Sequence, residues 1–203
     1  MPKQTFLNLT TAKQDQIIKA GISVFSQSTF NEVKISSIIS EAKIPRSSFY
    51  DYFDDKKDIY KYIILLIKDE KMTYMDPILN RNNLGFFEKL RDLFKAGAGF
   101  AAAKPEYNSI ARRMYENMPL LEELFGAGSI DVSESYKFML EEGINAGEIK
   151  KDVDVAFISK TIHILSSQMM IDAMKNKEDA MNQVIDDITD KIIDFIRSGI
   201  SNK

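Results

Sequence analysis

A short polar stretch in the first third of the chain concentrates side chains that could hold DNA. Arg46 can offer two donors to O6 and N7 of a guanine base. The hydroxyl groups of Ser48, Tyr50 and Tyr52 suit phosphate oxygens. Lys56 stands at the expected start of a further helix, where backbone N–H groups and the helix dipole also attract a phosphate. The chemistry of this stretch is therefore that of binding to a nucleic acid.

Two short helices joined by a tight turn would position these side chains. Apolar residues at helical spacing predict the first helix, at Ile35, Ile38, Ile39 and Ala42. A break at residues 43–45, with the apolar Ile44 tucked into it, precedes a second short pattern at Phe49, Tyr52 and Phe53. These are the proportions of a helix-turn-helix.

The second of these helices would carry the reading residues. Arg46, Ser47 and Tyr50 lie near its N-terminal end, which is the part that enters a major groove in such motifs. The alternative is a surface helix pair in an ordinary bundle. That alternative does not explain a Tyr-x-Tyr-Phe run placed directly before a helix that Asp55 can cap.

The distribution of charge agrees with this interpretation. Residues 1–68 carry ten Lys and Arg against seven Asp and Glu, a net charge of +3, whereas the whole chain of 203 residues carries −3. The remaining residues therefore carry −6. A basic N-terminal part joined to an acidic remainder indicates that the N-terminal part binds a polyanion.

The rest of the chain also predicts helices, and no strand pattern occurs, so the expected fold class is all-α. Thr11 with Gln14 predicts a capping box, Asp55 with Asp58 a capped helix start, and Gly147 a helix end. Loops are expected at Asp76-Pro77 and 80–85, at Met118-Pro119, and at 126–129. The expected helices span about 11–25, 35–42, 46–53, 55–75, 86–103, 106–117, 131–145, 155–175 and 178–199.

Several classes of protein are disfavoured. The chain has no cysteine, which excludes a disulfide framework, thiolate metal ligands and a cysteine nucleophile. His163 is the only histidine, and neither a metal-ligand cluster nor a nucleophile with its base accompanies it. We therefore expect no enzyme, no catalytic residues, no metal and no cofactor. No signal peptide and no run long enough to span a bilayer is present, which predicts a cytoplasmic protein without a membrane partner.

The helix-turn-helix resembles the DNA-binding domain of the TetR family. The likeness lies in the run Tyr50-Asp51-Tyr52-Phe53-Asp54-Asp55-Lys56 and in Phe6-Leu7-Asn8-Leu9 followed by Ile17-Ile18-Lys19-Ala20. It is specific over about residues 10–60. The resemblance implies that Arg46, Ser47 and Tyr50 face bases, and that Ser36 can reach one. It also implies phosphate contacts from Lys34, Ser37, Ser48, Tyr52 and Lys56.

Three residues depart from the family's usual pattern. Lys43 stands where the family usually has glycine, so we expect it in a left-handed conformation at a cost of roughly 1 kcal/mol. Ile39 replaces a smaller residue. Pro45 replaces the usual serine cap, and proline is tolerated at a helix start but offers no capping side chain.

The resemblance also implies a larger helical domain that binds a small molecule. We place the DNA-binding domain at 1–54 and the ligand-binding and dimerisation domain at 55–203, with the helix from 55 to about 75 joining them. An excess of Phe, Tyr and Met beyond residue 72 suits either a core or an adaptable apolar pocket. The candidate lining residues are Phe94, Tyr107, Met114, Tyr115, Met118, Tyr136, Met139, His163 and Gln168.

Two apolar stripes on the last two helices each need a partner. With the same pair from a second subunit they would form a four-helix bundle, although both could instead face the subunit's own core. The family resemblance favours the homodimer. The stripes consist of Val155, Ile158, Ile162, Leu165 and Met169, and of Val184, Ile188, Ile192, Phe195 and Ile196.

The sequence therefore predicts a DNA-binding transcriptional regulator, a repressor released from a palindromic operator by a small hydrophobic ligand. The alternatives are a helical enzyme with a small-molecule pocket and a helical scaffold that binds another protein through its acidic face. A gel-shift titration at varied salt separates them, because only the regulator binds a short palindrome tightly.

Overall fold

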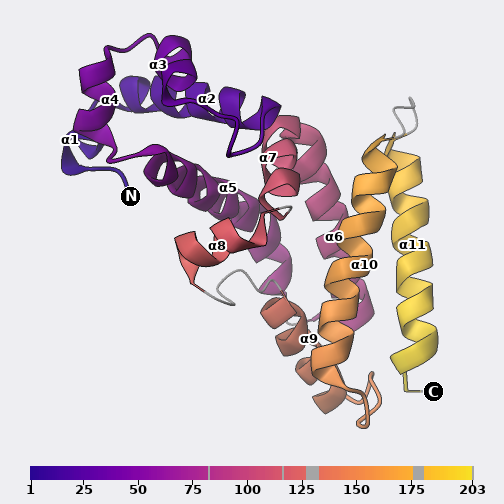
Figure 1. The fold of residues 1–203 in the computed structure, drawn as a ribbon. Helices are drawn as coiled ribbons and strands as arrows, with labels where there is room; N and C mark the ends of the chain where they lie inside the picture. The colour runs from indigo at the N-terminus through magenta and orange to yellow at the C-terminus, as the bar shows by residue number, and fades with distance from the viewer. Residues whose placement is uncertain (82, 116, 127–132, 176–180, 203) are drawn as a thin grey trace. The chain divides into compact units, whose positions relative to one another are not determined.

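The structure is a computed structural model that describes residues 1–81, 83–115, 117–126, 133–175 and 181–202, without the side chains of 115, 118, 167–175 and 181–185. In these ranges the chain is built from helices, as expected (Figure 1). The one extended pairing among the described residues is an isolated antiparallel bridge between Ile149 and Ser201. The helices are α1 (Gln4–Leu7), α2 (Thr11–Gln27), α3 (Ile35–Ala42), α4 (Arg46–Tyr52), α5 (Lys56–Leu79), α6 (Phe86–Ala103), α7 (Pro105–Tyr115), α8 (Met118–Phe125), α9 (Ser133–Asn145), α10 (Val155–Lys175) and α11 (Met181–Ile200).

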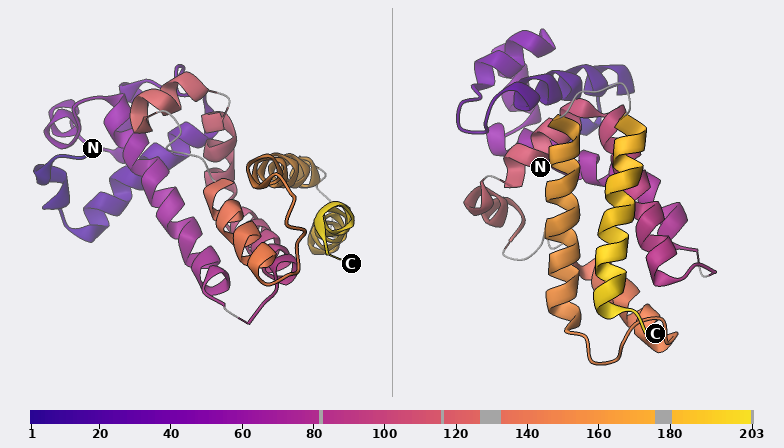
Figure 2. Two further views of the ribbon diagram at one scale, coloured as in Figure 1. Left: turned by 90° about the horizontal axis from the view of Figure 1, so that it is seen from below. Right: turned by 90° about the vertical axis from the view of Figure 1, so that its right-hand side faces the viewer.

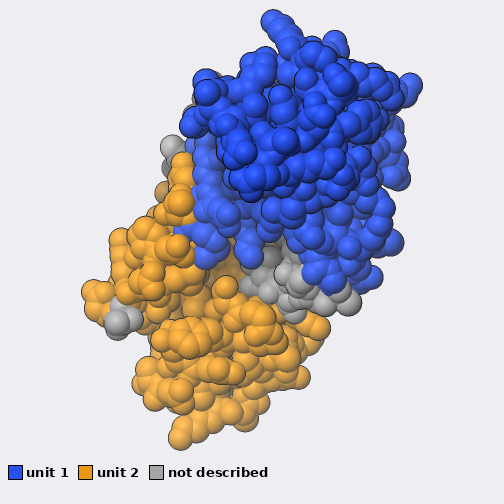
Figure 3. Space-filling view, turned by 90° about the vertical axis from the view of Figure 1, so that its left-hand side faces the viewer, with its two compact units in different colours: residues 1–72, 101–130 blue, residues 73–100, 131–203 orange. Residues whose placement is uncertain are grey.

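The chain divides into two compact units, each made of two segments. Unit 1 comprises residues 1–72 and 101–130, and unit 2 comprises residues 73–100 and 131–203 (Figure 3). Unit 1 therefore holds the helix-turn-helix together with α7 and α8. The boundary predicted after residue 54 separates the residues expected to bind DNA from the rest of the chain. It stays a prediction.

Unit 1 is organised around a close approach of α2 and α5. A Cβ atom on Gly21 would lie 2.7 Å from Cδ1 of Ile63 and 3.3 Å from Cδ1 of Ile59, so a larger residue here would force the Ile63 side chain to move. Phe25, Ile38 and the isoleucines of α5 fill the core beside it. Burying such side chains away from water is the main force that assembles the unit.

The start of α2 differs from the expected capping box. The helix begins at Thr11, so Thr10 is the residue at the N-cap, and its side chain makes no capping hydrogen bond. Gln14 turns away from the helix start, and its Nε2 donates to the carbonyl oxygens of Leu7 and Leu9, each at 3.0 Å. The prediction of a Thr11–Gln14 capping box was wrong because the helix begins one residue earlier than the box requires, which places Thr11 inside the helix and not at the N-cap.

Helix α5 begins as the sequence predicts but ends later. The backbone N–H of Asp58 donates to Oδ1 of Asp55 at 3.0 Å, which confirms Asp55 as the cap. The helix then continues to Leu79 instead of ending near Met75, and it includes Pro77. Proline lacks the N–H that would bond the carbonyl four residues earlier, so α5 gives up one helical hydrogen bond here and ends two residues after Pro77.

Helix α8 was not expected at all. The sequence predicts that a helix ends at Met118-Pro119, whereas these residues begin one. The side chain of Asn117 caps it by accepting from the backbone N–H of Leu120 at 3.3 Å, and proline in the first turn costs no hydrogen bond. The short helix α1 was also missed, because four residues are too few to show a period.

Unit 2 has a core of its own, to which α6, α9, α10 and α11 contribute side chains. Helices α10 and α11 lie side by side and antiparallel (Figures 1 and 2). The carboxylate of Glu148 caps the start of α6 by accepting from the N–H of Phe86 at 2.5 Å. Gly147, with φ of 78°, lies just beyond the end of α9, which confirms it as the expected end signal.

Two ion pairs fasten α6 to α11 within unit 2. A nitrogen of Arg91 lies 3.0 Å from Oδ1 of Asp190, and Nζ of Lys95 lies 3.0 Å from Oδ1 of Asp186. All four side chains are well exposed, so each pair contributes at most about 1 kcal/mol. The apolar contacts of the core hold these helices, and the ion pairs help to fix their register.

Candidate nucleic-acid interface

The turn between α3 and α4 has the conformation that a helix-turn-helix requires. Lys43 adopts a left-handed conformation, with φ of 50° and ψ of 49°, as the sequence predicts. Its N–H donates to the carbonyl of Ser40 at 3.2 Å, and the N–H of Ile44 donates to that of Ile39 at 3.3 Å. These bonds satisfy the free carbonyls at the end of α3. Ile44 is buried, so its side chain also holds the turn against the core.

Helix α4 presents a polar face to solvent. It begins at Arg46, directly after Pro45, which provides no capping side chain, as expected. Arg46, Ser47 and Tyr50 are exposed, whereas Phe49 on the opposite side is completely buried. The buried ring holds the helix to the core while the polar face stays free to meet a partner.

Arg46 and Tyr50 form a pair one turn apart on this face. A nitrogen of the Arg46 guanidinium lies 3.5 Å from the hydroxyl oxygen of Tyr50, and its Cζ lies 5.8 Å from the centre of the Tyr50 ring. The contact is loose and exposed, so it orients the guanidinium without consuming its other donors. Those donors remain suited to a base edge or a phosphate.

The other residues expected to contact DNA fall into two groups. Lys34, Ser36 and Ser37, at the start of α3, are exposed. Ser48 and Tyr52 are half-buried on α4. The structure therefore brings the two helix starts into one helix-turn-helix, with most of the predicted polar side chains accessible.

Lys56 is the exception among these residues, because its ammonium group is bound within the protein. Its Nζ donates to the carbonyl oxygens of Phe30 at 2.6 Å and Val33 at 2.8 Å. It also lies 4.3 Å from the centre of the Phe30 ring. Burial lowers the pKa of Lys56, since it disfavours the charged form. Sequence reasoning missed this role because the acceptors are backbone atoms more than twenty residues away.

Helices α7 and α8 contact α2 and α5 within unit 1. The guanidinium Nη1 of Arg113 donates to the carbonyl oxygen of Phe25 at 3.2 Å and to that of Ser26. Lys57, at the start of α5, forms an ion pair with Glu123 of α8, which raises the pKa of Lys57. The sequence alone does not indicate this role for Arg113. No local signal indicates a helix end as its acceptor.

Near Arg113, two residues have shifted pKa values. Burial raises the pKa of Tyr60 to about 12, and the charge of Arg113 opposes this shift. The pKa of Glu32 is lowered because its carboxylate accepts from the hydroxyl and the backbone N–H of Thr29, at 2.7 and 3.0 Å. Tyr60 packs between the rings of Phe25 and Phe30.

The residues expected to line a ligand pocket are divided between the units. Tyr107 and Met114 belong to unit 1, and Phe94, Tyr136, Met139 and His163 belong to unit 2. Phe94, Met114 and Met139 are buried, whereas the other three are half-buried. Tyr107 has a raised pKa, because of burial and a hydrogen bond with Glu70. The side chains of Tyr115, Met118 and Gln168 lie outside the described residues.

The residues expected at a dimer interface are of two kinds. Ile162, Ile192 and Ile196 are buried in the core of unit 2, and Val155, Ile158, Leu165 and Ile188 are partly buried against that core. Phe195, by contrast, is exposed. The side chains of Met169 and Val184 lie outside the described residues. Two exposed apolar residues of α10, Phe157 and Ile164, were missed because they fall outside the chosen stripe, although their seven-residue spacing puts them on one helix face.

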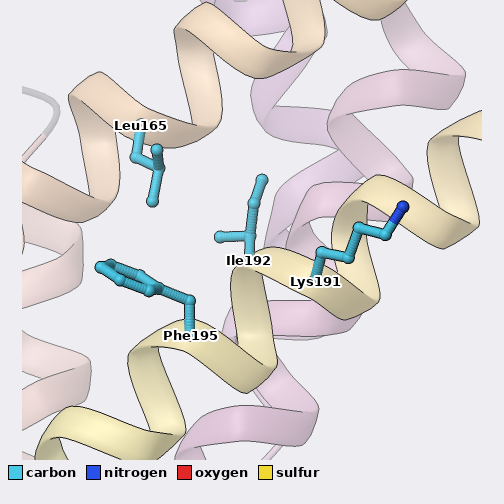
Figure 4. A pocket seen from close by; sticks show the side chains of 4 residues that line it. All are labelled: Leu165, Lys191, Ile192 and Phe195. Carbon is cyan, nitrogen blue, oxygen red and sulfur yellow. The ribbon is translucent and has the colours of Figure 1, made fainter.

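A shallow groove runs between α10 and α11. Its lining consists of Leu165 from α10 and of Lys191, Ile192 and Phe195 from α11 (Figure 4). The apolar side chains point toward one another, and the Lys191 ammonium points away from them (Figure 4). The groove is therefore an apolar surface with a charged rim.

Two properties of the described residues bear on other kinds of site. None of the described helices combines the length and apolar character needed to cross a membrane. Within the same residues, no three or more His, Asp or Glu side chains gather as metal ligands would.

Comparisons with known proteins agree with this geometry. Residues 17–63 match the family model of the bacterial regulatory proteins, tetR family. No match was found among the curated proteins. A TetR family transcriptional regulator from Chloroflexus aurantiacus J-10-FL has a similar structure, with 23% sequence identity, a TM-score of 0.77 and coverage of 100% of both chains.

Two regulators named FadR also share the fold. FadR from Bacillus subtilis, in complex with stearoyl-CoA, is 18% identical with a TM-score of 0.67, and the match covers 91% of this chain and 97% of that one. The fatty acid degradation regulator FadR from Bacillus halodurans is 18% identical with a TM-score of 0.69, and the match covers 92% and 97%.

The fold and the turn geometry define an all-helical protein with a helix-turn-helix near its N-terminus. The chain has the fold of a TetR-family transcriptional regulator, and its residues 17–63, which include the helix-turn-helix, match the model of that family. This confirms the resemblance drawn from Tyr50, Tyr52, Phe53 and Lys56.

Proposed function

We propose that this protein is a transcriptional repressor that binds a palindromic operator as a homodimer and is released by a small apolar ligand. The observation that carries the proposal is the exposed polar face of α4, where Arg46, Ser47 and Tyr50 stand on a helix whose opposite side is buried. Such a regulator would bind bacterial DNA in the cytoplasm.

Each chain would read one half-site through α4. Arg46 would contact a guanine, and Ser36, Ser47 and Tyr50 would contact neighbouring base edges. Phosphates would be held by Lys34 and Ser37 at the start of α3 and by the hydroxyls of Ser48 and Tyr52. The Lys56 ammonium is already bound to two carbonyls, so it would not contact a phosphate. The backbone N–H groups at the start of α5 would hold that phosphate instead.

A two-fold dimer through α10 and α11 would present two such helices. The exposed Phe157, Ile164 and Phe195 support this interface, together with the apolar groove beside them. The core of unit 2 already covers Ile162, Ile192 and Ile196, so the outward residues would make most of the contact between subunits. Bound to DNA, the two recognition helices would lie ~34–36 Å apart, the spacing of half-sites one helical turn apart.

The ligand would be apolar with few polar groups. The excess of aromatic and methionine residues beyond residue 72 supports this class, and stearoyl-CoA bound to the similar FadR from Bacillus subtilis makes long-chain acyl compounds the first to test. Such a ligand releases DNA only if it binds the DNA-incompetent conformation more tightly than the competent one.

Selection from a pool of random duplexes tests the DNA-binding half. The purified protein should enrich a palindrome, and fluorescence anisotropy should then show about a thousandfold or greater preference over a shuffled duplex of equal length. Binding should weaken steeply with salt. Equal affinity for the selected and the shuffled duplex at every salt concentration would contradict the proposal.

A second titration tests the ligand half. Long-chain acyl-CoA, free fatty acid and coenzyme A alone are added to the complex of protein and selected duplex. An apolar ligand should raise the melting temperature of the free protein and lower its DNA affinity, while coenzyme A alone should do neither. Compounds that stabilise the protein without changing DNA affinity would leave the DNA-binding half intact and refute release by that ligand.

A further inference from the structure

We propose that the segment Lys3–Leu9, here called the N-terminal arm, positions the recognition helix α4 by capping its C-terminal end. The arm lies outside residues 17–63 that match the family model. The inference rests on the proposed function, because it assigns a role in DNA reading to residues that do not touch DNA. Lys3 and Thr5 are the positioning residues, and Phe6 anchors them.

The arm supplies donors to three successive carbonyls of α4. The last carbonyls of any helix lack partners within the helix. Here the backbone N–H of Lys3 donates to the carbonyl oxygen of Tyr52 at 2.8 Å. The ammonium Nζ of Lys3 donates to that of Tyr50 at 2.9 Å, and the hydroxyl of Thr5 donates to that of Asp51. The end of the recognition helix is thus satisfied by residues from another part of the chain.

The arm is itself fixed in place. Phe6 has no solvent-exposed surface, and its ring centre lies 5.0 Å from that of Phe53 and 5.7 Å from that of Tyr62. Its ring also packs edge-to-face with the ring of Tyr52, the last residue of α4, with the two ring centres 6.2 Å apart. At the other end of the arm, Gln14 holds the carbonyls of Leu7 and Leu9. A fixed arm can therefore impose a position on α4.

Helix α4 has little else to hold its ends. It is seven residues long, and Pro45 at its start forms no side-chain cap. So short a helix is marginal without outside contacts. The Lys3 ammonium adds a favourable charge at the negative end of the helix dipole, and it pairs with Asp54 at 2.7 Å. Lys3 binds the carbonyl of Tyr50, and Tyr50 belongs to the exposed face of α4 that is proposed to read DNA. Lys3 therefore fixes the position of a residue on that face.

A lysine near a DNA-binding helix could instead contact a phosphate. The Lys3 ammonium is already committed to the Tyr50 carbonyl and the Asp54 carboxylate, which disfavours that role. The two roles differ in salt dependence. Losing a phosphate contact weakens all sequences alike and makes the salt slope shallower by about one. Losing a positioning contact lowers the preference for the operator and leaves the slope unchanged.

The test uses Lys3→Met and Thr5→Val, singly and together, in the full chain. Lys19→Met is the matched control, because Lys19 is an exposed lysine of α2 in the same unit. The double variant should lose about tenfold of the preference for the selected duplex over the shuffled one, as expected for two lost hydrogen bonds. The control should lose none, and the conservative Thr5→Ser should behave as the parent.

Amide hydrogen exchange in the free protein gives a readout that does not depend on DNA. In the double variant the amides of Phe49 and Phe53 should exchange faster, while those in the middle of α2 should stay unchanged. Equal acceleration in both helices would overturn the proposal, and so would a shallower salt slope with unchanged preference. If the unmodified protein prefers no duplex, the proposed function fails, and the exchange measurement still decides whether the arm caps α4.

Discussion

The ammonium nitrogen of Lys56 lies 2.6 Å from the carbonyl oxygen of Phe30 and 2.8 Å from that of Val33. A side chain at the start of α5 thereby fastens the segment that leads into α3. The same nitrogen lies over the Phe30 ring, so a cation–π contact adds to the two hydrogen bonds. The first role of this lysine is to hold the helix-turn-helix together.

Lys56→Ala should therefore destabilise the protein by about 1–3 kcal/mol, because two partly buried carbonyls lose a charged donor. Urea unfolding followed by circular dichroism measures this loss. Lys68→Ala, an exposed lysine on the same helix, is the control and should change stability by less than about 0.5 kcal/mol. Unchanged stability together with a shallower salt slope of DNA binding would instead show that Lys56 holds a phosphate.

Tyr60 should make the protein sensitive to alkali. Its pKa is raised to about 12 in the folded state, against 10.0 for an unperturbed tyrosine. The folded protein therefore keeps a proton that the unfolded chain releases, and stability present below pH 10 is lost as the pH rises toward 12. Unfolding curves between pH 9 and 11.5 should show this loss in the parent and a smaller one in Tyr60→Phe, whose ring keeps the packing. Identical pH profiles would contradict the assignment.

Arg113 should stabilise unit 1 by binding the end of α2. Its guanidinium donates to the carbonyls of Phe25 and Ser26, so Arg113→Met should cost about 1–3 kcal/mol. Arg112→Met is a closely matched control, because Arg112 is the exposed neighbour on the same helix. Thermal unfolding of the two variants measures the difference. Equal melting temperatures would show that the contact contributes nothing.

The proposed dimer interface can be tested with three exposed residues of similar accessibility. Ile164 is 67% exposed and Phe195 65% exposed, while Phe138 on α9 is 63% exposed and lies outside the proposed interface. Ile164→Glu and Phe195→Glu should each give a folded monomer in sedimentation velocity, because a charge would be buried between the subunits. Phe138→Glu should remain a dimer. Dimers in all three variants would place the interface elsewhere.

The sequence predicts the local features of this fold well. The cap at Asp55 and the helix-end signal at Gly147 each follow from residues within one turn of the feature, whereas the left-handed Lys43 follows from the resemblance to the family. Helix α8 shows the limit, because Met118-Pro119 fits a helix start as well as a helix end. The side chain of Asn117 decides between them.

Contacts between distant segments could not be predicted. Glu148 caps α6 from 62 residues away, and Arg113 reaches Ser26 across 87 residues. In each of these contacts one partner is a backbone group. Nearly every residue carries the same backbone groups, so the sequence does not indicate which of them forms the bond. The same reason hid the bonds of Lys56 and the capping of α4 by Lys3, although the helix-turn-helix itself was visible from its spacing.

The central claim is that α4 reads DNA sequence through Arg46. The most direct measurement is the affinity of the parent and of Arg46→Ala for the selected duplex and for variants of it substituted at each base pair. We predict that Arg46→Ala costs about 1–3 kcal/mol on the selected duplex and relaxes the preference at one base pair in each half-site, with the other positions unchanged. An Arg46→Ala variant that keeps the full preference at every position would contradict the account.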